Sequence, residues 1–338
     1  MTEIRILSAK DVAACLTMDE VIDAVRATYE QKATGEAEAW PMVYHAFEPG
    51  VADMDIKSGV LGGAGVFGHK TVAWFSENPA RGLPDLYGII VVLSAETGEP
   101  VGVVDGAAIT GMRTGAAGAL GARALANPEA ESLLMVGAGH QALYQIAATL
   151  ALFDGIETVR VANPHTPERA RAFVETLPGK LAGQFGIERA GVRFEAVDDL
   201  EAAVEASGIV VTATMATSPL IEAAWVRPGT HLSCMGADMP GKQEIAPAII
   251  ASARLFTDDT ANCASNGEIE RGLAEGAFGL DHVLGELGDV LVGKVPGRTS
   301  AEDVTVFDSA GTALLDIACA KIALDAAARR GLGTVAEL

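Results

Sequence analysis

The sequence contains few cysteines, few histidines and few basic residues, and each shortage excludes a class of protein. Its four cysteines form no CxxC pair, which argues against a disulfide framework and favours buried thiols in a reducing compartment. Its six histidines show no HExxH spacing, so we expect no protein-bound metal. Lys and Arg number 24 against 45 Asp and Glu, and the net charge of −21 argues against nucleic acid or an anionic membrane as a partner.

Targeting and membrane signals are also absent from the pattern. The first ten residues, MTEIRILSAK, contain no basic region followed by an apolar one. Residues 133–153 are long enough to cross a bilayer, but glycines, a histidine and two glutamines interrupt them. A buried strand, a glycine turn and a helix explain this stretch better. We therefore expect a soluble cytoplasmic protein.

The length of 338 residues and a change of pattern predict two domains. Between residues 40 and 104, short apolar runs separated by turn clusters indicate antiparallel strands. Beyond Asn127, strand-like and helical segments alternate, which indicates an α/β domain with a doubly wound parallel sheet. The glycine-rich segment 59–68 is predicted to be a loop, and a last strand at 304–307 precedes a long helix at 312–330.

A dinucleotide-binding turn is predicted at residues 137–142, which read GAGHQA. The first glycine permits a tight turn, the second lets the backbone approach a pyrophosphate, and the small last residue lets helix and strand pack closely. A plain glycine loop is the alternative. We favour nucleotide binding because a strand, the turn, a helix and a second strand follow in the required order.

The second strand of this motif leaves the cofactor type open. NAD enzymes usually place an acid at its end, whereas this chain has Asn163 followed by Pro-His-Thr. Arg169 lies one helical turn further and could reach the 2′-phosphate of NADP. The cofactor is thus NAD or NADP, with NAD slightly favoured.

Three charged residues stand in small-residue or apolar surroundings. Lys70 enters a strand and is either a solvated edge lysine or an anion clamp. Arg113 begins an Ala/Gly-rich helix and could bind an anion bidentately or pair with a carboxylate. Asp238 follows a strand of the parallel sheet, where it could cap a helix or exchange a proton beside a nicotinamide ring.

Several motifs, in one order along nearly the whole chain, carry a family resemblance. They are residues 68–70, 78–84, 97–100, 110–114, the turn at 137, 236–244, and 307–311 with Asp316. The most specific are the Arg-Thr pair before an Ala-rich helix and the Pro-Gly-Lys that closely follows Asp238. On these residues the chain resembles the ornithine cyclodeaminase/mu-crystallin family, which includes archaeal-type alanine dehydrogenase and ketimine reductases.

The resemblance implies an architecture and a set of roles. A Rossmann dinucleotide-binding domain is expected at residues 127–303, and a second α+β domain, built from residues 1–126 and 304–338, is expected to form a shared barrel in a homodimer. Asp238 matches the catalytic aspartate, Lys70 the lysine that binds the substrate carboxylate and joins in catalysis, and Ala310 a further substrate contact. Arg113 matches the arginine that lies between the substrate carboxylate and the cofactor and contacts both. The other implied cofactor contacts are Thr114, Gly137, Gly139, His140, Gln141, Asn163, Thr214, Met235, Lys242 and Ser309.

The carboxylate clamp departs from the family pattern. Members often carry an arginine near a proline ahead of the glycine loop, but residues 40–45 read WPMVYH. Lys57 could supply the missing substrate-binding charge, and a solvated loop lysine is the alternative. Asp85 stands where members usually have serine or threonine. Ornithine is therefore in doubt as the substrate.

The expected activity is an NAD(P)-dependent hydride transfer that interconverts a 2-imino acid (or a 2-oxo acid plus amine) and the L-amino acid. Asp238 would act as acid and base. The alternative is a cyclodeaminase-type ammonia-lyase that recycles its NAD, and a third possibility is a non-enzymatic binder of small molecules. The substrate side chain, the choice of NAD or NADP, and any assembly beyond a dimer are not determined by the sequence.

Overall fold

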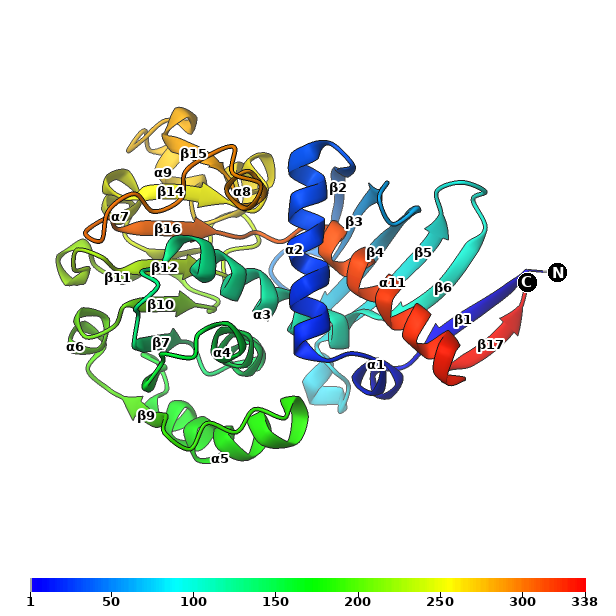
Figure 1. Cartoon of the computed structure of the whole chain (residues 1–338), viewed down its shortest axis with the longest axis horizontal. Coiled ribbons are helices and arrows are strands. Elements are labelled where there is room, and N and C mark those ends of the chain that lie inside the picture. Colours follow the sequence, from blue (N-terminus) through cyan, green and yellow to red (C-terminus); the bar gives the residue numbers. More distant parts are fainter. Residues whose placement is uncertain (1) are drawn as a thin grey trace. The chain divides into compact units, whose positions relative to one another are not determined.

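The computed structural model describes residues 2–338, and the chain forms two compact units (Figure 1). The first unit runs to Arg113 and resumes with Thr312–Leu338, and the second is Thr114–Gly311. Helix α3 (Gly106–Leu125) passes from the first unit to the second. The chain ends are therefore in one unit, and the alternating strand–helix region forms the other.

The first unit contains a seven-stranded sheet and three further helices. The strands are β1 (Glu3–Leu7), β2 (Ala37–Glu48), β3 (Ala52–Leu61), β4 (Val66–Phe75), β5 (Leu86–Ser94), β6 (Pro100–Asp105) and β17 (Thr334–Glu337). The helices are α1 (Ala9–Cys15), α2 (Met18–Thr34) and α11 (Ala313–Arg330). The sheet order is β17-β1-β6-β5-β4-β3-β2, and all neighbours are antiparallel except β1 and β6.

Local sequence accounts for the helix starts in this unit. Ser8 and Thr17 cap α1 and α2, and each forms a capping box with an acid three residues later. Helix α11 packs along α2 and against β3 to β6, so the two long helices cover one face of the sheet (Figure 1). The predicted antiparallel strands are confirmed.

The glycine-rich segment 59–68 is not a loop, which corrects the prediction. Residues up to Leu61 belong to β3, and β4 begins at Val66, so only the tip turns. Gly59 and Gly68 are cross-strand partners. A Cβ on Gly68 would lie 2.2 Å from the Val91 carbonyl oxygen, and one on Gly59 would lie 2.6 Å from that of Glu38. These glycines allow close packing inside the sheet.

The second unit contains an eight-stranded parallel sheet and a two-stranded one. The large sheet comprises β7 (Ser132–Val136), β8 (Thr158–Ala162), β9 (Arg193–Val197), β10 (Ile209–Thr212), β12 (His231–Cys234), β14 (Arg254–Thr257), β15 (Val283–Glu286) and β16 (Thr305–Asp308). The small sheet pairs β11 (Thr217–Ile221) with β13 (Gln243–Ile245). The helices are α4 (His140–Leu152), α5 (Pro167–Phe185), α6 (Leu200–Glu205), α7 (Pro247–Ser252), α8 (Thr260–Asn266), α9 (Glu270–Ala274) and α10 (Leu287–Leu291).

The large sheet has the strand order β15-β14-β16-β12-β10-β7-β8-β9. From β7 the chain proceeds outward to β8 and β9, then returns to β10 on the other side of β7. This reversal is the switch point at which open α/β sheets bind ligands, outside the carboxyl ends of the strands. The predicted Rossmann-type sheet is confirmed.

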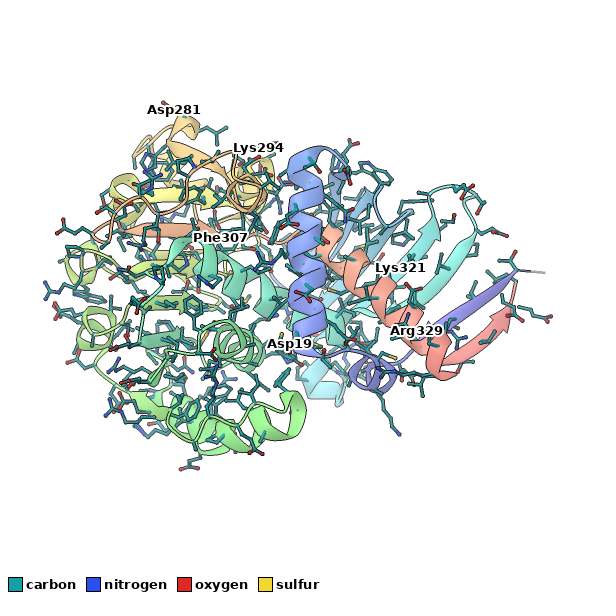
Figure 2. The ribbon with its side chains drawn as sticks, viewed as in Figure 1. Asp19, Asp281, Lys294, Phe307, Lys321 and Arg329 are labelled. Carbon is teal, nitrogen blue, oxygen red and sulfur yellow. The ribbon has the colours of Figure 1, made fainter. Side chains whose placement is uncertain are left out.

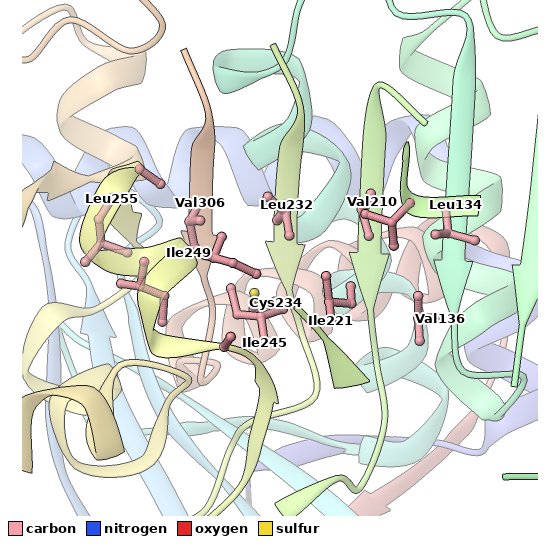
Figure 3. Packing of buried hydrophobic residues seen from close by; sticks show 14 of the residues in the cluster. Leu134, Val136, Val210, Ile221, Leu232, Cys234, Ile245, Ile249, Leu255 and Val306 are labelled. Carbon is pink, nitrogen blue, oxygen red and sulfur yellow. The ribbon is translucent and has the colours of Figure 1, made fainter. Parts of the chain in front are cut away.

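The core of this unit consists of small and branched apolar residues from adjacent strands. Leu134, Val210, Leu232 and Val306 lie in a row on neighbouring strands, with Ile249 of α7 packed over them (Figure 3). Val306 belongs to β16, which pairs with β12 and β14. The strand at 304–307 thus lies in the parallel sheet and not in the chain-end domain to which we assigned it. All four residues of β16, Thr305–Asp308, are fully buried, as an interior strand of a two-sided sheet requires.

The apolar stretch 133–153 forms β7, a turn and α4, as predicted. Across residues 2–338, no helix combines the length and the apolar character needed to span a bilayer. The four cysteines, Cys15, Cys234, Cys263 and Cys319, are free and buried.

Candidate functional site

The predicted dinucleotide turn joins β7 to α4 at the switch point of the parallel sheet. Gly137 has φ +107°, and a Cβ there would lie 2.6 Å from the Ala213 carbonyl oxygen, so both conformation and space require glycine. Gly139 is the N-cap of α4 and offers no side chain to its first N–H groups. The positive end of the helix therefore remains available to a phosphate.

Polar atoms beside this turn fit a bound dinucleotide. Gln141, in the first turn of α4, has a buried Oε1 without a hydrogen-bond partner, and the buried Thr114 hydroxyl also lacks one. Burial lowers the pKa of His140, whose ring lies 5.1 Å from that of Tyr144. Buried polar atoms normally find partners, so these positions fit a cofactor that supplies them.

Other predicted cofactor contacts gather at the same edge of the sheet. Asn163 follows β8, Thr214 follows β10, Met235 follows β12, and Ser309 with Ala310 follows β16. Because these strands are parallel, their carboxyl ends share one edge. The Ser309 hydroxyl donates to Asp258 Oδ2 at 2.7 Å, so its position is already determined by a protein partner.

Asp238 lies in the turn after β12, and its side chain is 53% exposed. Lys242, predicted as a cofactor contact, is buried, pairs with Asp238 and donates to the Gly236 carbonyl oxygen at 3.2 Å. Asp238 does not cap a helix, because the next helix, α7, begins at Pro247. This excludes the helix-cap alternative that the sequence left open.

The first unit contains a buried cluster of opposite charges around Asp316. Lys70 Nζ lies 3.0 Å from Asp316 Oδ2, and Arg113 Nε lies 3.0 Å from Asp316 Oδ1. Asp316 is fully buried, Lys70 is 4% exposed and Arg113 7%. Lys70 also approaches Thr110 Oγ1 at 3.4 Å. Lys70 is therefore not a solvated edge lysine, and Arg113 has a carboxylate partner.

Lys57 of β3 stands directly across from Lys70 of β4, which places both side chains on one face of the sheet. Burial lowers the pKa of Lys70 to about 8, Asp316 opposes this shift, and Arg113 and Lys57 strengthen it. Burial alone would raise the pKa of Asp316, but Arg113 and Lys70 hold it below its ordinary value. Lys57 is thus part of a strand and electrostatically coupled to the cluster, not a loop lysine.

The sequence placed Asp316 in one of the family motifs, but we predicted no role for it. It lies in the first turn of α11, where a carboxylate is favoured by the helix dipole. The signal available in the sequence was an acid in the first turn of the last helix, shortly after the Asp308-Ser309 motif. Glu244, Glu268, Asp258 and Asp308 were also missed, and all four are fully buried near the carboxyl edge of the parallel sheet.

The fold and the turn at Gly137 define a dinucleotide-binding α/β protein. The chain belongs to the ornithine cyclodeaminase/mu-crystallin family, whose model matches residues 2–331. It is 34% identical over 333 residues to iminosuccinate reductase from Paracoccus denitrificans, covering 98% of this chain and 99% of the relative.

Solved structures agree with this assignment. An archaeal alanine dehydrogenase dimer with bound NAD has a TM-score of 0.92 and 32% identity, and both chains are covered completely. Δ(1)-pyrroline-2-carboxylate reductase from Thermococcus litoralis, in complex with NADH and L-proline, has a TM-score of 0.89 and 28% identity. It covers 98% of this chain and 99% of that one. The predicted family and fold are confirmed.

Proposed function

We propose that this chain is an NAD(H)-dependent oxidoreductase that interconverts a 2-imino acid, or a 2-oxo acid plus amine, and the corresponding L-amino acid. The observation that carries the proposal is that this chain has both a glycine turn before an uncapped helix N-terminus at the switch point and a buried Lys70–Asp316–Arg113 cluster. Relatives named as an iminosuccinate reductase, a pyrroline-2-carboxylate reductase and an alanine dehydrogenase support it.

In this proposal each charged residue has one task. A bound reduced nicotinamide supplies the hydride. Lys70 and Arg113, the two cations that flank Asp316, bind the substrate carboxylate by charge-assisted hydrogen bonds. Asp238 holds a proton at the imine nitrogen, which makes the imine carbon electron-poor, and takes a proton back in the reverse direction.

The first test is turnover. A panel of 2-oxo acids with ammonia or methylamine, assayed with NADH and with NADPH, should show consumption of reduced cofactor at 340 nm. Relatives with reductase or dehydrogenase names favour this activity over the cyclodeaminase alternative. A cyclodeaminase would release ammonia from a diamino acid without a net absorbance change, and that result would replace our proposal.

Asp238→Asn tests the acid–base role. We expect a fall in kcat of about 100-fold or more with an unchanged NADH dissociation constant, because the amide cannot exchange the proton. Asp281→Asn, at an exposed acid of the same unit, is the control (Figure 2). Wild-type kcat in Asp238→Asn would remove this residue from the reaction.

Lys70→Met tests the carboxylate-binding role. One charged hydrogen bond is worth about 1.5–3 kcal/mol, so KM for the imino acid should rise by about 10-fold to 100-fold. The half-buried Lys321 of α11 provides the control Lys321→Met, which should keep the wild-type KM. An unchanged KM in Lys70→Met would contradict the clamp.

We also propose that the chain forms a homodimer through the first unit. The sheet face opposite α11 exposes Val43 (56%), Phe47 (58%), Tyr87 (49%) and Ile89 (51%), and exposed apolar side chains that gather on one face mark an interaction surface. In light scattering, the wild type should have the molar mass of two chains, whereas Ile89→Glu should have the molar mass of one chain. Leu280→Glu, at an equally exposed residue of the second unit, should stay dimeric.

A cytoplasmic location remains part of the proposal. Four free, buried thiols fit a reducing compartment.

A further inference from the structure

Glu244 is a fully buried carboxylate that receives four hydrogen bonds from two neighbouring strand ends. Its Oε1 accepts from the Thr214 N–H at 2.6 Å and from the Thr214 hydroxyl at 2.8 Å. Its Oε2 accepts from the Thr212 hydroxyl at 2.6 Å and from the Gly236 N–H at 2.9 Å. Thr212 and Thr214 belong to the end of β10, and Gly236 to the end of β12.

These donors lead directly to residues of the proposed chemistry. Thr214 is a predicted cofactor contact, and Asp238 follows Gly236 by two residues. We propose that Glu244 is the positioning residue of this edge: it ties the end of β10 to the end of β12 and so sets Thr214 and the turn carrying Asp238 in one arrangement. The inference rests on the proposed function and adds to it a residue that touches neither substrate nor cofactor.

Gly236 packs closely against Thr214 and Glu244. A Cβ on Gly236 would lie 2.5 Å from both the N and the O of Thr214 and 2.6 Å from the Glu244 carboxyl carbon. The chain returns from Asp238 to Glu244 through Gly241, which has φ +82°. Lys242 closes the turn by binding Asp238 and the Gly236 carbonyl oxygen. Asp238 is thus at the outer end of a short turn whose inner end is held by Glu244.

A second buried carboxylate, that of Glu268, binds the backbone of Glu244. Glu268 accepts the Glu244 N–H at 2.8 Å and the Ile245 N–H at 2.7 Å. Asp308 in turn accepts the Glu268 N–H at 3.1 Å and the Ile269 N–H at 3.2 Å. Glu268 therefore holds the backbone of β13, whereas Glu244 is the one of these two carboxylates that bonds the strand ends of β10 and β12. This difference supplies a matched control.

The experiment compares Glu244→Gln with Glu268→Gln. The amide keeps the shape of Glu244 but turns a donor toward the N–H and hydroxyl donors, so the tie between the strands weakens. At a temperature well below each variant's Tm, we expect Glu244→Gln to weaken NADH binding about 10-fold by fluorescence titration and to lower kcat about 10-fold. Glu268→Gln should lower Tm while its NADH dissociation constant and kcat stay within about 2-fold of wild type.

Thr212 provides a milder pair of variants should Glu244→Gln fail to fold. Thr212→Val removes one hydroxyl partner of Glu244 at nearly constant volume and should weaken NADH binding about 3-fold. Thr212→Ser keeps the hydroxyl and should restore wild-type binding, a rescue that a purely structural loss of packing would not produce. Amide hydrogen exchange at Thr214 and Gly236 should be faster in Glu244→Gln and Thr212→Val than in wild type.

The outcomes separate this inference from the proposed function. Wild-type NADH binding, kcat and amide protection in Glu244→Gln and Thr212→Val would overturn the positioning role, whatever happens to Tm. Equal losses of NADH binding and kcat in Glu268→Gln would also overturn it, because the effect would then be one of general stability. If wild type turns over no imino acid, the proposed function fails, while hydrogen exchange at the two N–H groups still decides the role of Glu244.

Discussion

The two units bury charged side chains in opposite ways. In the first unit, one carboxylate, Asp316, lies between Lys70 and Arg113, each 3.0 Å away. In the second unit, Glu244, Glu268 and Asp308 are equally buried, but in residues 2–338 their hydrogen-bond donors are backbone N–H groups and hydroxyls rather than lysines or arginines.

This difference sets the protonation of the carboxylates. The two cations hold the pKa of Asp316 below its ordinary value. Burial raises the pKa of Asp308 to about 8 and also raises those of Glu268 and Glu244, because N–H donors offset only part of the desolvation. At neutral pH, Asp308 thus favours the protonated form, whereas Asp316 favours the ionised form.

The largest effect is expected from removing the charge of Asp316. Asp316→Asn leaves two buried cations without their carboxylate, and breaking a buried pair costs about 3–5 kcal/mol of unfolding free energy. Urea denaturation at pH 7 measures this loss. Asp325→Asn, in the partly exposed pair with Lys321 on the same helix, should cost at most about 1 kcal/mol. Equal losses in both variants would show that the buried cluster does not depend on its charge.

The second expected effect is a pH dependence of stability that belongs to the second unit. The folded pKa of Asp308, about 8, exceeds the ordinary value of 3.8, so between these values the folded state holds a proton that the unfolded state releases. The stabilisation contributed by the proton on Asp308 should therefore be complete below about pH 4 and should be lost as the pH rises toward about 8.

Scanning the Tm from pH 4.5 to 8.5 measures this fall. In Asp308→Asn the decline should be shallower, because its amide does not titrate. Asp281→Asn, at an exposed acid of the same unit, should keep the wild-type slope. Parallel slopes for wild type and Asp308→Asn would refute the contrast between the two clusters.

The smallest expected effect is on the pH profile of activity. Lys70 has a pKa of about 8, so above that pH the clamp loses a positive charge and kcat/KM for the imino acid should fall about 10-fold per pH unit. Lys70→Arg should remove this alkaline limb, because arginine stays protonated. A direct NMR titration of Lys70 Nζ checks the same pKa without turnover. A midpoint near the ordinary lysine value would show that burial does not lower this pKa.

The sequence predicted those parts of the site that local pattern specifies. The turn at Gly137 was recognisable because strand, glycines and helix follow within a few residues. Lys70, Arg113 and Asp238 were found as charged residues in apolar or small-residue surroundings. The role of Asp316 was not, because its partners lie 246 and 203 residues earlier in the chain.

Other errors have the same origin. Gly59 and Gly68 look like loop residues until β2 and β5 approach them, and the short strand β16 carries no local sign of the sheet it joins. Glu244 looks like one more acid of a strongly acidic chain until β10 and β12 supply its four donors. Each of these roles depends on neighbours that are remote in sequence.

By itself, the sequence determined the alternation of strands and helices beyond Asn127, the dinucleotide turn and the family, because these depend on spacings of a few residues and on local hydrogen bonds. Only the tertiary structure decided that β16 lies between β12 and β14, that Asp316 holds two cations, and which buried carboxyls keep their protons. Burial and the charges that surround a group come from segments far apart in the chain, and these set the free energy of ionisation.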